Sequence, residues 1–320
     1  MRVIRLSALL VLTAALSIAT RAQTGSYTCA QFQFFGPTNN QGNSVPYGTS
    51  VNSSDRVVGV YDYYQTQYGF TDMPGGTFKK FLYAGDTGTY FGGINDAGDV
   101  VGYSYYYTQS GIQVAHSFEG NTQGLSVNIV YPGAADTFAT GINNQSQIVG
   151  YYLPQTPPTQ GFILSDGQFT SLAVPGAETT QPFAINDSGT VVGTWQGFNP
   201  EAFIYSDGTY TTEAGPAGSG ETFFTGINNQ SQIAGYYLNT NVNPPVFQGF
   251  VYSGGTYYIA AIPNTKSVEL GGINNNGDIT GGVTLTNGNQ PAFLGTQCTL
   301  SSASGGSASR TSEPGKSLPR

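Results

Sequence analysis

The chain has 320 residues, a formal net charge of −8 at pH 7 and only 9% charged residues. Between positions 23 and 300 the only basic residues are Arg56, Lys79, Lys80 and Lys266, which excludes the basic face that nucleic acids and anionic membranes require. The abundance of Tyr, Phe, Val, Ile, Thr and Gly, without a sustained 3.6-residue hydrophobic period, predicts strands and turns with almost no helix.

Residues 1–22 have the pattern of a signal peptide. Arg2 and Arg5 precede an apolar run over 6–19, and Ala22 stands before the expected cleavage point. The run is too short to cross a bilayer, although a membrane anchor is the alternative reading. We therefore expect export to the medium or the periplasm, no membrane insertion after cleavage, and a monomer.

One unit is repeated along the chain. The segment Gly141–Tyr152, GINNQSQIVGYY, returns almost unchanged at Gly226–Tyr237, and looser copies begin at Val51, Gly93, Ala184 and Gly272. The copies share one asparagine, found as Asn52, Asn95, Asn143, Asn186, Asn228 and Asn274. These are spaced by 42 to 48 residues, which predicts one supersecondary unit repeated six times.

The third copy shows the content of a unit. We expect four strands, called a to d, over 137–142, 148–152, 160–164 and 168–174, with Asn, Asp and Gly at the turns between them. Four short strands at this period are typical of a β-propeller blade. The length variation between units is confined to the loop between strands b and c.

The two ends of the repeat array complement each other. The sixth unit stops after its third strand, and residues 28–35 supply a spare strand at the N-terminus. Cys29 and Cys298 both map to the position of the missing c–d hairpin, which predicts a disulfide, with two unpaired thiols as the alternative. The predicted fold is thus an all-β, six-bladed propeller of four-stranded antiparallel blades over 23–300, closed by the N-terminal strand. Residues 301–320 are expected to form a disordered tail.

The core GINxxGxVVGY, followed by short aromatic strands such as Glu201-Ala202-Phe203 and Pro291-Ala292-Phe293, resembles the HAF-type repeats of secreted bacterial proteins. The resemblance covers about Val51 to Phe293 and implies an extracellular propeller with Kelch-like strand order. It implies no reaction, so no functional residue follows from it.

Few residues suggest catalysis or metal binding. His116 is the only histidine, and we interpret it as a polar residue of strand c rather than a catalytic one. Turns such as Asn95–Asp99 loosely resemble calcium loops, but most copies lack the carboxylates that Ca²⁺ prefers. We expect hairpin turns there, with Ca²⁺ as a possible cofactor and no other.

Acids precede strand a in four units, at Asp86, Asp136, Glu178 and Glu221. If strand a is innermost, these carboxylates would surround the channel mouth; the alternative is that an acid at this place simply begins a strand. Exposed aromatic residues of the b–c loops, Tyr63, Tyr106 and Trp195, would form a stacking rim suited to sugars or peptides.

The sequence therefore predicts a secreted binding or scaffold module, not an enzyme, whose ligand is a glycan or a peptide over the central channel. The alternatives are a carbohydrate-active enzyme, a glycosidase or lyase using the channel-mouth carboxylates, and a purely structural surface protein. The enzyme would need two carboxylates facing each other across one pocket.

Overall fold

The computed structural model describes residues 24–36, 44–64, 66–72, 78–121, 124–197 and 200–302. Within these residues every named element is a β-strand, so the expectation of an all-β fold is confirmed. No helix in this part of the chain could span a membrane. The predicted signal peptide and almost all of the predicted tail lie outside the described residues.

The strands form four sheets. One eight-stranded sheet contains β2 (Ser44–Val51), β3 (Val57–Tyr63), β4 (Thr66–Asp72), β5 (Lys79–Phe81), β6 (Gly88–Ile94), β7 (Asp99–Tyr107), β8 (Gln113–Asn121) and β9 (Gly124–Ile129). Two four-stranded sheets follow, β10 (Ala134–Ile142), β11 (Ile148–Pro154), β12 (Gln160–Ser165) and β13 (Gln168–Leu172), then β14 (Thr179–Ile185), β15 (Val191–Gln196), β16 (Pro200–Ser206) and β17 (Thr209–Glu213). The other eight-stranded sheet contains β18 (Ser219–Ile227), β19 (Ile233–Asn239), β20 (Val246–Ser253), β21 (Thr256–Ala260), β22 (Thr265–Ile273), β23 (Ile279–Leu285), β24 (Ala292–Ser301) and β1 (Thr24–Phe35).

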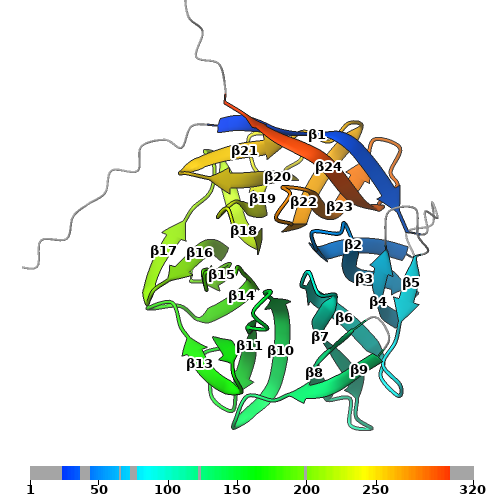
Figure 1. Ribbon diagram of the computed structural model, residues 1–320, viewed down its shortest axis with the longest axis vertical. Coiled ribbons are helices and arrows are strands. Elements are labelled where there is room, and N and C mark those ends of the chain that lie inside the picture. The colour runs from blue at the N-terminus through cyan, green and yellow to red at the C-terminus, as the bar shows by residue number, and fades with distance from the viewer. Residues whose placement is uncertain are drawn as a thin grey trace, which may run out of the picture.

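The sheets are arranged around a central axis (Figure 1). In each run of four antiparallel strands the first strand is innermost, and these first strands contact one another around the axis, with β22 against β2. Parallel pairing joins two such runs within each eight-stranded sheet, through β1–β21 and β4–β6. This radial arrangement of antiparallel units is that of a β-propeller.

The repeated asparagine links neighbouring units. In five copies its Oδ1 accepts the backbone N–H groups of the residues two and four positions later, and in the second copy it accepts the N–H group four positions later. These hydrogen bonds close the a–b turn. Its Nδ2 donates to the backbone carbonyl of the next copy's asparagine at 2.9–3.4 Å, and the series returns from Asn274 to Asn52. One residue type thus fixes both the turn and the contact between units.

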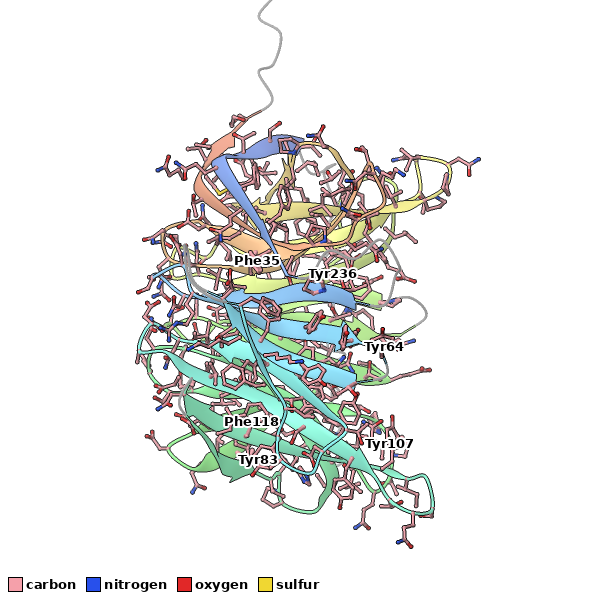
Figure 2. All side chains as sticks on the ribbon, turned by 90° about the vertical axis from the view of Figure 1, so that its right-hand side faces the viewer. Phe35, Tyr64, Tyr83, Tyr107, Phe118 and Tyr236 are labelled. Carbon is pink, nitrogen blue, oxygen red and sulfur yellow. A yellow bond between two sulfur atoms is a disulfide. The ribbon has the colours of Figure 1, made fainter. Side chains whose placement is uncertain are left out.

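The glycine of strand b is required by a close approach. At Gly150 an added Cβ would lie 2.0 Å from the Phe138 carbonyl oxygen and 2.8 Å from the ring of Phe162. Every equivalent glycine meets the matching carbonyl oxygen of strand a, and Gly59, Gly102 and Gly235 also meet the matching phenylalanine ring. The strand c phenylalanines that cover these glycines are buried (Phe118 is labelled in Figure 2). The spacing from the asparagine to the glycine is therefore constant because strands a, b and c of a unit pack together at this glycine.

The N-terminal strand joins two units. β1 pairs antiparallel with β24, and Cys29 stands opposite Cys298 with a disulfide between them, as the sequence predicted. The start of β1 also pairs parallel with β21, from Thr24 beside Tyr257 to Tyr27 beside Ala260, which the sequence did not reveal. Strand β24 runs to Ser301, so it extends one residue into the segment expected to be a tail.

Candidate ligand site in the central channel

Two sets of residues on the innermost strands contribute to a cavity at the axis. All six residues three positions before the repeated asparagine line it, and so do three of the six residues five positions before it. The layer five before it consists of Tyr47, Tyr90, Phe138, Gln181, Phe223 and Glu269. The layer three before it consists of Thr49, Gly92, Thr140, Phe183, Thr225 and Gly271, and each inner strand changes register at this residue.

The bulged threonines bind the units together. The Thr140 hydroxyl donates to Val149 O of its own unit at 3.2 Å and to Pro182 O of the next unit at 2.8 Å. Thr49 and Thr225 make the same pair of contacts. The alternate units carry glycine or Phe183 at this position. The glycines let neighbouring inner strands approach closely, because an added Cβ would lie 2.7 Å from Thr140 O at Gly92 and 1.9 Å from Gly48 O at Gly271.

A cavity of about 240 Å³ lies along this part of the channel. It is lined by all six residues of the bulge layer and by Tyr47, Tyr90, Tyr236 and Glu269. Tyr236 comes from β19, where it stacks on Phe223 with ring centroids 4.8 Å apart. The lining therefore combines four aromatic rings with threonine hydroxyl groups and one carboxyl group.

Glu269 is the one carboxylate among the described residues that line this cavity. Its side chain is partly buried and makes no hydrogen bond to another described residue. Burial raises the pKa of this carboxyl above its ordinary value. Five of the six units place an aromatic ring or an amide where this unit places the acid.

The tyrosines beside Glu269 are close enough to share its field. Burial, then the charges of Tyr236, Tyr90 and Glu269, raise the pKa of Tyr47 well above its ordinary value. Burial, then the charge of Glu269, likewise raises the pKa of Tyr236. The Tyr47 hydroxyl donates to Leu270 O at 3.1 Å. These phenols are neutral at physiological pH and present both hydroxyl groups and ring faces.

The other end of the channel carries a polar network at the tips of the a–b turns. Asn144 donates from Nδ2 to Asp96 Oδ2 at 3.0 Å and to Asp187 Oδ2 at 3.1 Å. Asn229 Nδ2 donates to Asp187 Oδ2, and Asn275 Nδ2 donates to Asp96 Oδ2. Because the turn asparagines use their oxygens to accept backbone N–H groups, the contacts here are those of hairpin turns rather than of a calcium loop.

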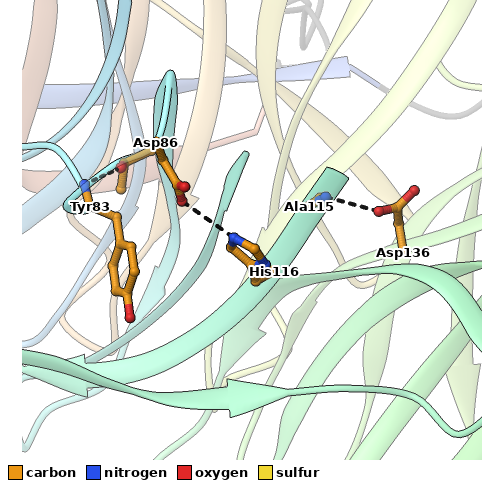
Figure 3. Close-up of polar contacts among 6 residues, drawn as sticks. Tyr83, Asp86, Ala115, His116 and Asp136 are labelled. Carbon is orange, nitrogen blue, oxygen red and sulfur yellow. Dashed lines mark hydrogen bonds and ion pairs between the residues drawn. The ribbon is translucent and has the colours of Figure 1, made fainter. Parts of the chain in front are cut away.

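Two of the predicted acids flank strand β8 (Figure 3). The Asp86 side chain is 6% exposed, and its Oδ2 lies 3.6 Å from Nε2 of His116 with no hydrogen-bond partner. Asp136 accepts the backbone N–H of Ala115 at 2.9 Å. Both acids therefore contact the third strand of a unit, and neither is part of the cavity lining.

The other two predicted acids also lie outside that lining. Glu178 is exposed, whereas Glu221 is partly buried and its charge is one of the causes that raise the pKa of Tyr236. Glu221 is thus the predicted acid whose field reaches a channel residue.

The predicted aromatic residues occupy three separate places. Tyr63 packs against Tyr61 and lies 5.7 Å from Lys80 Nζ. Tyr106 lies against His116, with ring centroids 5.5 Å apart, so it joins Asp86 in one cluster. Trp195 packs into a hydrophobic cluster, where its Nε1 is buried without a partner. Figure 2 places Tyr64 and Tyr107, at the ends of two b–c loops, on one side of the molecule.

Sequence reasoning missed Glu269, Tyr47 and Tyr90. A signal was present, because aligning the copies on their asparagine shows one acid among aromatic residues at the fifth position before it. The acids chosen instead stand seven to nine positions before the asparagine, near the irregular starts of the inner strands.

No family model matches this sequence, and no curated protein does. Among solved structures, a protein of unknown function from Dyadobacter fermentans has a TM-score of 0.54 at 9% identity, covering 84% of this chain and 99% of that one. Trypanosoma rangeli sialidase has a TM-score of 0.50 at 8% identity, covering 83% of this chain and 59% of the sialidase. The β-propeller domain of the Trilobed protease from Pyrococcus furiosus has a TM-score of 0.44 at 10% identity, covering 76% of this chain and 78% of that domain. At such identities a likeness bears on the fold alone.

Proposed function

We propose that this chain is a secreted, six-bladed β-propeller that acts as a binding module, with its ligand in the central channel. In this proposal β1 completes the last blade and closes the ring. The circle of asparagine contacts from Asn52 back to Asn274 supports six units, and the Cys29–Cys298 disulfide suits an oxidising compartment. Membership of the HAF-type repeat proteins is part of the same proposal.

The observation that carries the binding role is the carboxyl group of Glu269 in an aromatic cavity. Glu269 is partly buried, and partial removal of a carboxylate from water costs free energy, so a ligand that supplies a partner for it offsets that cost on binding. Pockets that combine aromatic walls with few polar groups are typical ligand sites.

The ligand enters from the face that carries the b–c loops. The Glu269 layer is farther from the a–b turns than the bulge layer, because each inner strand ends at those turns. Tyr63, Tyr64 and Tyr107 are 37%, 71% and 53% exposed at or beside these loops, so a glycan or peptide larger than the cavity could extend over them. The alternative, a carbohydrate-active enzyme, would need two carboxylates that face each other, whereas the described lining of this cavity contains one.

Ligand-observed NMR against glycans, peptides and small metabolites, followed by methyl chemical shifts of the labelled protein, tests this proposal. A ligand in the channel shifts the methyl signals of Thr49, Thr140 and Thr225, which line the cavity. Thr211 and Thr212 of β17 are exposed at the outside of a unit and serve as the control. Shifts confined to outer threonines would place the site elsewhere.

A further inference from the structure

We infer that the ligand group held in the channel is a small organic cation, such as the substituted ammonium group of an amine. This inference rests on the proposed channel site and adds the chemistry of its occupant. It depends on three features of the described cavity: its charge, its aromatic walls and its size.

The charge in the channel is negative. Glu269 is the only charged side chain among the residues that line the cavity. The polar network with Asp96 and Asp187 belongs to an adjoining cavity, which shares the bulge layer with the first one. None of the basic residues Arg56, Lys79, Lys80 and Lys266 lines either cavity. Because carboxylates in a low-dielectric channel concentrate cations, the field favours a positively charged ligand.

The walls suit a cation that is weakly hydrated. Tyr47, Tyr90, Phe183 and Tyr236 line the same cavity as Glu269. Aromatic faces attract organic cations, and cages of such rings recognise quaternary ammonium groups. The carboxylate and the rings therefore favour the same class of ligand.

An inorganic ion fits the site less well. Divalent cations need several oxygen ligands, and the described residues contain no group of three or more His, Cys, Asp or Glu side chains placed to hold a metal. The cavity of about 240 Å³ is far larger than a bare ion and smaller than most pockets for drug-sized molecules. It can hold one headgroup, while the rest of a ligand lies toward the b–c loops.

Isothermal titration with tetramethylammonium and choline, at ionic strength matched with sodium chloride, tests the inference. The neutral control is 3,3-dimethylbutan-1-ol, which has the shape of choline without its charge. We expect both cations to bind and to shift the methyl signals of Thr140 and Thr225, and the neutral alcohol to bind at least tenfold more weakly. Glu269→Gln should lower the affinity for both cations at least tenfold, whereas the exposed Glu178→Gln should change it less than twofold.

The outcomes separate this inference from the proposed function. If the neutral alcohol binds in the channel as tightly as choline, the cation inference is wrong while the channel remains a binding site. If neither cation binds, the inference is again wrong, and a glycan or peptide that shifts the channel threonines would still support the proposed function. If cations bind equally well to wild type and to Glu269→Gln, the carboxylate does not recognise them and the inference is overturned.

Discussion

At the scale of single residues, the repeated asparagine has two tasks that a shorter or apolar side chain cannot combine. Asn228 is 2% exposed, and its Oδ1 accepts N–H groups of Gln230 and Gln232 while its Nδ2 donates to Asn274 O. Removing the amide leaves the turn N–H groups of Gln230 and Gln232 without their acceptor and removes one of the two hydrogen bonds that Asn274 O accepts, the other coming from Gly277 N–H. Such unpaired groups cost more than the net value of the bonds themselves.

We therefore predict that Asn228→Ala lowers the free energy of unfolding by about 2–4 kcal/mol. Gln230 lies in the same turn, is exposed and makes its hydrogen bond through its backbone, so Gln230→Ala should stay within about 0.5 kcal/mol of wild type. Urea unfolding of both variants measures the difference. Equal losses would mean that the asparagine side chain does not hold the units together.

The strand b glycine allows a second residue-scale prediction. Gly150→Ala places a methyl group 2.0 Å from Phe138 O, so the strands must separate, and we expect a loss of about 2–4 kcal/mol or failure to fold. Gly124→Ala, where no atom lies within 4 Å of the added methyl, should be nearly neutral. Thermal unfolding of the two alanine variants makes the comparison, and a stable Gly150→Ala protein would contradict the packing described here.

At the scale of elements, the pattern of the repeat predicts where the strands lie but does not identify the residues of the candidate site. The asparagine and glycine recur because each makes the same backbone contact in every unit, and the phenylalanine of strand c is buried in every unit. Their spacing therefore predicts the strands and, through the unit that lacks a hairpin, the disulfide. Glu269 is the only acid at its position among the aligned copies, so the repeat pattern does not predict its place in the site. The parallel pairing of β1 with β21 joins two neighbouring units, which a single repeat does not describe.

The pairing of β1 leads to a prediction about the disulfide. It links residues 269 apart, and in the chain-entropy model such a crosslink stabilises by roughly 5 kcal/mol, an upper estimate. The double variant Cys29→Ser, Cys298→Ser should therefore unfold at markedly lower urea concentration than wild type. Dithiothreitol should lower the wild-type midpoint to the same value and leave the variant unchanged. A variant as stable as the oxidised wild type would show that β1 is held without the crosslink.

At the scale of the whole molecule, units of nearly identical backbone surround a channel that is not uniform. The circle of asparagine contacts gives every unit the same neighbours, whereas the inner layer varies from Thr to Gly to Phe. A scaffold repeated for stability can differ at the axis without disturbing its blades, because these side chains face the channel. Glu269 lies in the neighbouring layer, where partial burial of its carboxyl group has a cost in stability, which is expected of a residue retained for binding.

The measurement that tests this account most directly is the pH dependence of unfolding in wild type and Glu269→Gln without ligand. Because burial raises the folded-state pKa of Glu269, the folded protein binds more protons than the unfolded chain between the two pKa values. Wild-type stability should thus fall, relative to Glu269→Gln, as pH rises from about 4 toward 7. We expect similar melting temperatures near pH 4 and a higher one for Glu269→Gln at neutral pH. A Glu269→Gln protein that is less stable than wild type at neutral pH would make the carboxylate a structural group and contradict its assignment to a binding site.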